Sequence, residues 1–526
     1  MAAPAAVMTV QNGSSAKTTT STPAHGEFYN VEYGNDKENK QFVKRINLQY
    51  GKYFGILSAL GFQLLEPRQP YTYIRIIDNI IEEVDRSVIQ NEFVNYVKKH
   101  HKPPIGIDKK QIIQLLHSGS SNYFSDSKLS FLFPENEIVY NSDTKDECYI
   151  YYRNGFVKCT PKGANFIDYK NLKGKIWKDQ KNDRDFRHLG WELTNETITD
   201  GFGEWQKFIH NVCRARKKTG NNYSAEEREK STKRLVSLYS ILGYMMHHFF
   251  DYALKAVVFT DSKISVNAEG GTGKSLIGEA LGKVRNRTVI NGKNFKTDNQ
   301  FKYQTAKRDT QIIHLNDTDD KLRVEGLFND ITDRIEVRKL HKEPFPINAK
   351  FILSANKTLS IEGDSALRRF IEFELSSYYG KDFTPEDDFK HRLFTNWDSE
   401  EWNRFDNLMA YCACYFLKYG LIAPEPINLL KRKLMENTSI EFVEFMQDRI
   451  SEGQIKFNEE FCVNELFREF FDEHPNYEKH TRFRNMQDKK KCLTFFANAY
   501  ESKLITKRSN SKYYGTFDRQ QMTLPF

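Results

Sequence analysis

The amino-acid sequence predicts an α/β fold: a parallel-sheet core, a mixed α+β region before it and a winged-helix domain near the C-terminus. Three observations support this prediction. Apolar strands alternate with helical segments between residues 256 and 395, which is the order of βαβ units. Aromatic-rich segments of mixed pattern precede this region. Residues 439–519 run helix, helix, basic helix and short hairpin, which is a winged-helix pattern.

Composition and periodicity divide the chain into successive segments. The first is rich in Ser, Thr and Ala, which predicts a disordered tail. The helical collar contains a candidate capping box, Ser224 with Glu227 three residues later. The predicted segments are the tail 1–27, an N-terminal accessory domain 28–205, the helical collar 206–255, the α/β core 256–395, a helical connector 396–438, the winged-helix domain 439–519 and a C-terminal tail 520–526.

Overall composition indicates a globular, water-soluble protein. The chain has 526 residues, of which 39% are hydrophobic and 28% are charged. No apolar run reaches the roughly 18 residues that a membrane span needs. The seven cysteines form no C-x-x-C pair, and their odd number favours a reducing, cytoplasmic compartment. Cys412 and Cys414 are expected to be buried apolar residues rather than metal ligands.

A glycine-rich segment between a predicted strand and a predicted helix is a candidate phosphate-binding loop. The segment AEGGTGKS follows the pattern G-x-x-x-x-G-K-[ST], except that alanine replaces the first glycine. Glycines in such a loop let backbone N–H groups approach phosphate oxygens, the lysine neutralises the β- and γ-phosphates, and the serine binds Mg²⁺. A glycine turn without a ligand is the alternative. The candidate ligands of a nucleoside triphosphate are Ala268, Glu269, Gly270, Gly271, Thr272, Gly273, Lys274 and Ser275.

Polar residues at the ends of the following strands complete this candidate site. Asp317 is the expected Mg²⁺-binding carboxylate because it lies closest to its strand, with Asp319 and Asp320 as alternatives. Asn316 or one of these acids is expected to orient the attacking water. Asn356, at the end of the next strand, is expected to sense the γ-phosphate or to position water between the two strands. Ordinary turn residues are the competing interpretation for each of them.

Two arginines, Arg368 and Arg369, stand directly before the last predicted strand, FIEFEL. An arginine in this place can reach the nucleotide of a neighbouring subunit and stabilise the charge of the transition state. A pair of surface arginines without a catalytic role is the alternative.

Basic residues gather in two predicted surface features. Residues 333–347 predict a β-hairpin whose basic tip would contact a nucleic-acid backbone, unless it is simply a solvent-exposed hairpin. The chain carries a net charge of +8, and its C-terminal region is rich in lysine and arginine, which is compatible with a polyanionic partner. A charge run alone favours the alternative, a solvated lysine-rich surface. The candidate nucleic-acid-binding residues are Arg338, Lys339, His341 and Lys342 in the hairpin, and Lys489, Lys490, Lys491, Lys507 and Arg508 in the winged-helix domain.

The order of these motifs resembles that of the superfamily 3 helicases, the AAA+ motors of small DNA viruses, phages and plasmids. The segments that carry the resemblance are AEGGTGKS, IIHLND, RKLHK, FILSAN and RRFIEFEL, over roughly residues 230–385, together with the preceding helix Leu235–Leu254. The segment NGFVKCTPKGANF also resembles the region before the helicase domain of poxvirus- and phage-type primase-helicases. Ala268 and Asn316 depart from the family pattern, and the second departure leaves the catalytic base open.

The resemblance implies a specific assembly and activity. It implies an AAA+ P-loop ATPase core that uses ATP and Mg²⁺, with Lys274, Asp317 and Asn356 as catalytic residues of one subunit. In this family the arginine just before the last strand is the finger, which favours Arg369 over Arg368. It further implies a ring, expected to be a hexamer, whose hairpins move along single-stranded DNA.

The last residues form a second, weaker resemblance. Gln521–Phe526 (QMTLPF) is similar to the Q-x-x-L-x-[LF] peptides that dock bacterial sliding clamps through a glutamine and two apolar anchors. An ordinary C-terminus packed on its own domain is the alternative. A clamp peptide would suit a phage or other mobile element in a bacterial cytoplasm.

The combined prediction is an ATP-dependent replicative DNA helicase that acts as a ring on single-stranded and forked DNA. One alternative is an origin-binding ATPase that does not unwind processively. Another is a primase-helicase, although residues 1–225 show no convincing D-x-D polymerase signature. A metabolic P-loop kinase would need neither the hairpin nor the basic C-terminal domain.

Overall fold

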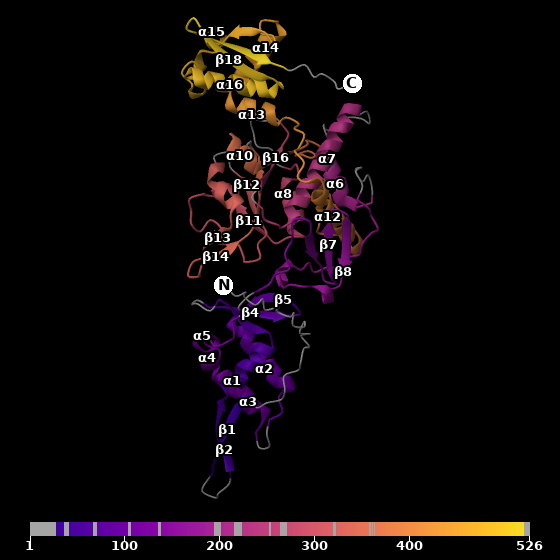
Figure 1. Ribbon diagram of the computed structural model, residues 1–526, viewed down its shortest axis with the longest axis vertical. Helices are drawn as coiled ribbons and strands as arrows, with labels where there is room; N and C mark the ends of the chain where they lie inside the picture. The colour runs from indigo at the N-terminus through magenta and orange to yellow at the C-terminus, as the bar shows by residue number, and fades with distance from the viewer. Residues whose placement is uncertain are drawn as a thin grey trace, which may run out of the picture. The chain divides into compact units, whose positions relative to one another are not determined.

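The computed structural model forms two compact units, residues 1–140 and 141–526 (Figure 1). The predicted accessory domain 28–205 is therefore divided between the two units. The predicted α/β fold, with helices and several sheets, is confirmed. The structure describes residues 28–35, 41–66, 71–103, 107–134, 138–193, 201–214, 224–251, 254–263, 271–318, 322–356, 359, 361 and 363–519.

The first unit combines antiparallel strands with short helices around an aromatic core. The tight turn between β4 and β5 uses Asp78 and Asn79, whose φ values of 50° and 65° belong to the left-handed region that Asp and Asn tolerate. A capping box of Asp108 and Gln111 begins α3. The elements are β1 (Tyr29–Asn35), β2 (Gln41–Leu48), α1 (Tyr50–Ala59), β3 (Phe62–Glu66), β4 (Thr72–Ile77), β5 (Ile80–Val84), α2 (Arg86–His100), α3 (Lys109–Ser118), α4 (Ser120–Tyr123) and α5 (Asp126–Leu129).

A five-stranded parallel sheet is the centre of the second unit. The strand order is β11-β12-β15-β10-β16, so every strand ends at the same edge of the sheet. The inner strands β10 and β15 are buried along their whole length, which explains their nearly continuous apolar sequences. The strands are β10 (Ala256–Asp261), β11 (Arg287–Asn291), β12 (Ile312–Thr318), β15 (Lys350–Ala355) and β16 (Phe370–Leu375).

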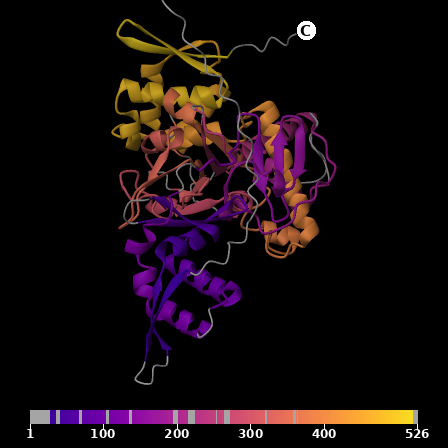
Figure 2. The same ribbon diagram turned by 60° about the horizontal axis from the view of Figure 1, so that its bottom comes forward.

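Helices and a small antiparallel sheet share one hydrophobic core with the parallel sheet. Helices α7 and α12 pack against each other, and the strands β6–β8 lie beside α12 (Figure 2). Cys412 and Cys414 are buried in α12, as predicted, and all seven cysteines carry free thiols. The elements are β6 (Cys148–Tyr151), β7 (Phe156–Thr160), β8 (Gly163–Ile167), β9 (Ile176–Trp177), α6 (Gly203–Cys213), α7 (Ala225–Met246), α8 (Lys274–Gly282), α9 (Phe328–Thr332), β13 (Ile335–Val337), β14 (Phe345–Ile347), α10 (Asp364–Arg369), α11 (Pro385–Phe389) and α12 (Ser399–Tyr419).

Helix α7 begins as predicted but ends early. The capping box of Ser224 and Glu227 is present. The helix stops at Met246, although the apolar periodicity continues to Leu254. Its last carbonyl groups are taken by two buried cations: Lys350 Nζ donates to the carbonyls of Tyr244 and His247, and Arg285 Nε donates to the carbonyl of Met246. Cations at a helix C-terminus satisfy its unpaired carbonyls and stabilise the end there.

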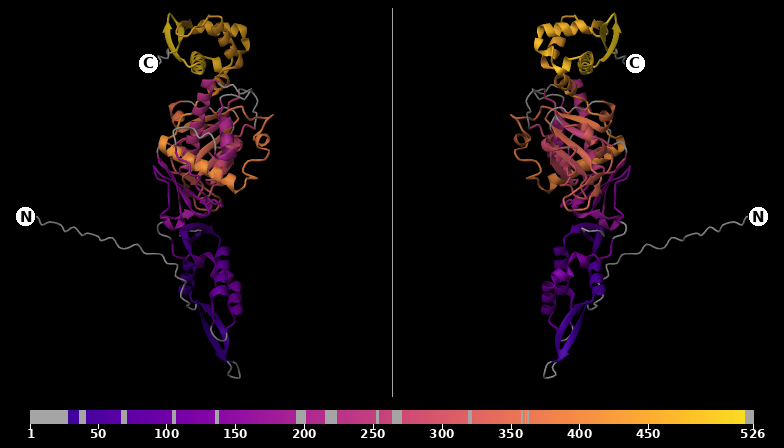
Figure 3. Two further views of the ribbon diagram at one scale, coloured as in Figure 1. Left: turned by 90° about the vertical axis from the view of Figure 1, so that its right-hand side faces the viewer. Right: turned by 90° about the vertical axis from the view of Figure 1, so that its left-hand side faces the viewer.

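The C-terminal residues form a three-stranded antiparallel sheet with helices and their own aromatic core (Figure 3). The strand order is β17-β19-β18, and the β18–β19 hairpin lies at one side of the helices. The predicted order of two helices, a basic helix and a hairpin is observed. The elements are α13 (Leu429–Asn437), α14 (Ile440–Ser451), β17 (Glu460–Cys462), α15 (Val463–Glu473), α16 (Met486–Ala499), β18 (Lys503–Ser509) and β19 (Lys512–Asp518).

The described residues contain neither a membrane-spanning helix nor a cluster of metal ligands. Among them, no helix is long and apolar enough to cross a membrane. The same residues contain no group of three or more His, Cys, Asp or Glu arranged to hold a metal ion.

Candidate functional site

A cavity of about 440 Å³ lies at the carboxyl-end edge of the parallel sheet, where ligands bind in open α/β folds. It brings together Lys274 and Ser275 of the loop with Asp317 and Asn356, which come from two later segments of the sequence. Ala268, Glu269, Gly270, Asp319 and Asp320 lie outside the described residues. The cavity is lined by Gly271, Thr272, Gly273, Lys274, Ser275, Leu276, Asn316, Asp317, Ser354, Asn356, Thr384 and Pro385.

The end of the glycine loop has a conformation that requires glycine. Gly271 and Gly273 have φ values of 96° and 99°, in the left-handed region. A Cβ atom at Gly273 would lie 2.5 Å from Cζ of the buried Phe208 ring. Helix α8 begins at the next residue, Lys274, so its N-terminal N–H groups lie at the cavity. Such a helix N-terminus, with its partial positive charge, favours an anion.

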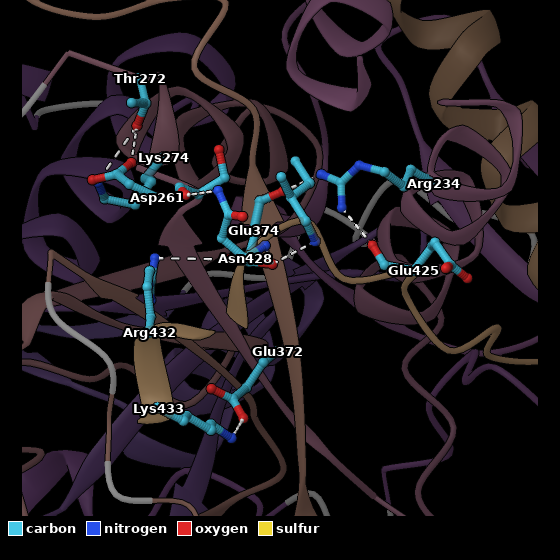
Figure 4. A network of polar contacts seen from close by, with 12 residues as sticks. Arg234, Asp261, Thr272, Lys274, Glu372, Glu374, Glu425, Asn428, Arg432 and Lys433 are labelled. Atoms are coloured by element: carbon cyan, nitrogen blue, oxygen red, sulfur yellow. Dashed lines mark hydrogen bonds and ion pairs between the residues drawn. The ribbon is translucent and has the colours of Figure 1, made fainter. Parts of the chain in front are cut away.

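The loop lysine is buried and already has a carboxylate partner, Asp261, the last residue of β10 (Figure 4). The Lys274 ammonium donates to one oxygen of Asp261, and the Thr272 hydroxyl donates to the other. Burial lowers the pKa of Lys274, and the charge of Asp261 opposes this shift. Asp261 was not among the residues predicted from the sequence, although an acid that ends the strand before the loop was a usable signal.

A bulge in β12 turns two neighbouring side chains into the cavity. Leu315 pairs with Leu353 and Thr318 pairs with Ala355, so the two residues between them, Asn316 and Asp317, oppose a single residue of β15. Neighbours on a regular strand point to opposite faces. Asp317 has a φ of 56°, which is uncommon outside glycine. The bulge and the left-handed conformation of Asp317 together explain how both side chains line one cavity.

The polar groups of the cavity are connected to one another. Ser275 Oγ donates to Asn316 Oδ1 at 3.3 Å, and Asn356 Nδ2 donates to Asp317 Oδ1 at 2.7 Å. Lys293 Nζ lies 2.6 Å from the other oxygen of Asp317. Hydroxyl, amide and carboxylate oxygens are the ligands that Mg²⁺ prefers, so Ser275, Asn316 and Asp317 fit a hard divalent cation.

A neutral histidine lies behind the cavity wall. Arg287 Nη1 donates to Nδ1 of His314 at 2.9 Å, so the proton of the neutral ring is on Nε2, which donates to Ser354 Oγ at 2.7 Å. Burial and the charge of Arg287 lower the pKa of His314 to about 3. Because Ser354 lines the cavity, His314 orients a hydroxyl group toward it. The sequence contained no motif that identified this pair.

The two candidate finger arginines lie in α10, and neither is among the described residues that line this cavity. Arg369 lies over the Phe328 ring at 4.8 Å, and its Nη1 donates to the Ser365 carbonyl at 3.1 Å. Arg368 is exposed. A finger that serves a neighbouring subunit is not required to contact the cavity of its own chain.

The predicted hairpin is observed, with β13 and β14 paired in antiparallel register. Arg338, His341 and Lys342 are exposed at its tip, whereas Lys339 lies over the Phe345 ring at 5.5 Å. The tip therefore presents three exposed basic side chains.

The predicted basic residues of the C-terminal domain have unequal environments. Lys489 lies over the Phe467 and Phe471 rings, and burial lowers its pKa. Lys490 lies over the Tyr513 ring at 4.2 Å. Lys491, Lys507 and Arg508 are exposed, and Lys507 forms an ion pair with Glu460.

Comparisons with known proteins give one sequence match and several structural ones. Residues 266–369 match a family of unknown function, DUF5906. A search of curated proteins finds no significant match.

Three solved structures illustrate the structural likeness. The apo C-terminal region of NrS-1 is 13% identical over 89% of this chain and 98% of its own, with a TM-score of 0.35. A JCV helicase with a bound small molecule is 10% identical over 48% of this chain and 67% of its own, with a TM-score of 0.22. The Drosophila ORC bound to DNA is 9% identical over 63% of this chain and 94% of its own, with a TM-score of 0.15. All three TM-scores are below 0.5, so the function proposed below rests on the geometry of the residues.

Proposed function

We propose that this protein is an ATP-dependent DNA helicase of replication, with an AAA+ core of the superfamily 3 type. One observation carries the proposal: Lys274, Ser275, Asp317 and Asn356 line one cavity at the carboxyl-end edge of a parallel sheet. A lysine at a helix N-terminus and a carboxylate at the end of a neighbouring strand are what binding and hydrolysis of a nucleoside triphosphate require.

The residues of the cavity have distinct roles in this proposal. The backbone N–H groups at the start of α8 and the Lys274 ammonium bind the phosphates. Ser275 and Asp317 hold Mg²⁺, which when bound neutralises charge on the β- and γ-phosphates. Asn356 donates to one carboxylate oxygen of Asp317 and keeps it fixed. The other oxygen, which now pairs with Lys293, would bind the metal in place of Lys293. Asn316 or an acid of residues 319–320 orients the attacking water.

The proposed motor acts as a ring, which we expect to be a hexamer. Arg369 would reach the nucleotide of the neighbouring subunit, where a cation stabilises transition-state charge. The exposed Arg338, His341 and Lys342 would contact single-stranded DNA through its phosphates. The sliding-clamp peptide Gln521–Phe526 lies outside the described residues and stays a proposal.

A second candidate function, an origin-binding ATPase, is favoured by the C-terminal domain. Its order of elements and its sheet β17-β19-β18 support the winged helix that we propose, in which α16 would enter the major groove and the β18–β19 hairpin would contact the backbone. Lys491, Lys507 and Arg508 are exposed in this domain. Strand separation distinguishes a helicase from a protein that only retains duplex DNA.

The test compares purified wild-type protein with Lys274→Ala. We expect the wild type to hydrolyse ATP and separate a forked duplex, and Lys274→Ala to lose about 100-fold or more of both activities. The control is Lys283→Ala, which removes a partly exposed lysine at the other end of α8. Unwinding by Lys274→Ala at the wild-type rate would refute the proposal. ATP-dependent duplex retention without strand separation would favour the origin-binding ATPase, and labelled primers would show primase activity.

A further inference from the structure

The candidate phosphate loop forms hydrogen bonds with an acid of the same chain, Asp261. Asp261, Thr272 and Lys274 are all buried, with exposed fractions of 5%, 7% and 8%. Both oxygens of the Asp261 carboxylate are used, one by the Thr272 hydroxyl and the other by the Lys274 ammonium (Figure 4). The ammonium that a triphosphate needs is therefore already paired with a negative group.

The Asp261 carboxylate lies on a part of the sheet that is held from several sides. Asp261 is in register with Leu375 of β16, and the next residue, Ser262, donates its N–H to the Leu375 carbonyl at 2.9 Å. The Ser262 carbonyl accepts from Asn428 Nδ2 at 2.8 Å. Asn428 is the N-cap residue of α13, so β10 is fixed to β16 and to the start of that helix.

A buried acid fixes the start of α13 in turn. The Glu374 carboxylate accepts from the backbone N–H of Ile427 at 2.7 Å and of Asn428 at 3.0 Å, and Arg432 Nη1 lies 3.9 Å from it. The carbonyl of Glu374 accepts from the buried Arg234. Because these bonds hold the end of β10, Asp261 has little freedom to move, whereas Lys274 has a long, flexible side chain.

A triphosphate at the loop meets this arrangement in one of two ways. In the first, Lys274 turns from Asp261 to the phosphates, which breaks a buried ion pair and leaves the carboxylate without its cation. In the second, Lys274 stays shared, which brings two negative groups close together around a buried ammonium. Both alternatives oppose nucleotide binding, because a buried charge without its partner and a pair of like charges are each unfavourable.

We propose that Asp261 is a positioning residue that competes with the triphosphate for Lys274 and so weakens nucleotide binding. The inference rests on the proposed function, since it takes the ligand of the loop to be a nucleoside triphosphate. Asp261 holds Lys274 when no nucleotide is bound and releases it when phosphates enter. A purely structural Asp261, which only kept the loop in shape, would have the opposite effect when it is changed.

The test is the affinity for a fluorescent ATP analogue in the presence of Mg²⁺, measured by titration of the full-length protein. Asp261→Asn keeps the size of the side chain and an oxygen for the Thr272 hydroxyl but removes the charge. We expect it to bind the analogue about tenfold more tightly than the wild type. Asp261→Glu keeps the charge and is expected to show no such gain. The Michaelis constant for ATP should fall with the dissociation constant, while kcat changes less.

The matched control is Asp330→Asn. Asp330 also accepts from a lysine and a hydroxyl, Lys302 and Tyr303, each at 2.7 Å, and it does not line the described cavity. This variant should bind the analogue as the wild type does. If Asp261→Asn does not fold, as judged by circular dichroism, Asp261→Ser gives the same comparison.

The outcomes separate this inference from the proposed function. If the wild type binds the analogue and the folded, uncharged Asp261 variants bind equally or more weakly, the competition is refuted and the nucleotide site stands. If neither the wild type nor any variant binds, the proposed function itself fails.

Discussion

Replacing Gly273 by alanine tests the geometry of the phosphate loop directly. Gly273 has a φ of 99°, where a residue with a Cβ atom is strained by roughly 1–2 kcal/mol. The new Cβ atom would also lie 2.5 Å from the Phe208 ring. That ring cannot easily move, because it is fully buried and stacked between Trp205 at 4.9 Å and Tyr379 at 5.6 Å. Forcing an extra carbon into such packing costs roughly 1–3 kcal/mol.

The two effects together predict that Gly273→Ala lowers the free energy of unfolding of the second unit by about 2–5 kcal/mol. Urea unfolding followed by tryptophan fluorescence is a suitable assay, because Trp205 stacks on the affected ring. The midpoint should fall while the slope stays that of the wild type. Gly380→Ala is the control, since a Cβ atom there would meet nothing within 4 Å. A Gly273→Ala variant that unfolds at the wild-type urea concentration would refute the loop conformation described here.

Two further predictions concern a buried histidine and the basic hairpin. The pKa of His314 is lowered from 6.5 to about 3, so between these values the unfolded chain binds a proton that the folded chain does not. Its contribution to stability is therefore complete above pH 6.5 and is lost as the pH falls toward 3. Unfolding midpoints measured over this range should depend less on pH in His314→Gln than in the wild type. The control is His117→Gln, which changes an exposed histidine and should behave as the wild type does. Equal slopes of midpoint against pH in His314→Gln and the wild type would contradict the prediction. Lys342→Ala should weaken binding of single-stranded DNA and lower the slope of log affinity against log salt by about 0.7, because one phosphate contact is lost. Fluorescence anisotropy at several salt concentrations measures this slope, with the exposed Lys99 of the first unit as the control, and an unchanged slope would exclude Lys342 from the DNA-binding surface.

The parts of the candidate site that follow from local sequence could be predicted. A glycine loop between a strand and a helix has a recognisable pattern, and the carboxyl ends of parallel strands meet at one edge, so Lys274, Asp317 and Asn356 were expected to converge. The bulge that turns both Asn316 and Asp317 into the cavity was not predictable, because it depends on the register of β12 against β15. A strand pattern read from one segment contains no information about that register.

Features that depend on distant residues were missed for the same reason. The apolar periodicity of α7 continues past Met246, but the helix ends where Lys350 and Arg285, about 100 and 40 residues further along the chain, take its carbonyls. Asp261 lies only a short distance before the loop in the sequence, yet its importance follows only from its contacts with Thr272 and Lys274. Likewise, Lys489 belongs to a basic run, but its side chain packs on two phenylalanine rings.

In the proposed function, nucleotide binds at Lys274, and an arginine from a second subunit of a DNA-enclosing ring completes the site. Electron microscopy of the protein with a non-hydrolysable ATP analogue, Mg²⁺ and forked DNA tests it most directly. The predicted result is a ring around single-stranded DNA, with the phosphates at Lys274 and Ser275 and Arg369 reaching them from the neighbouring subunit. A monomer, or a nucleotide bound away from Lys274, would contradict the claim.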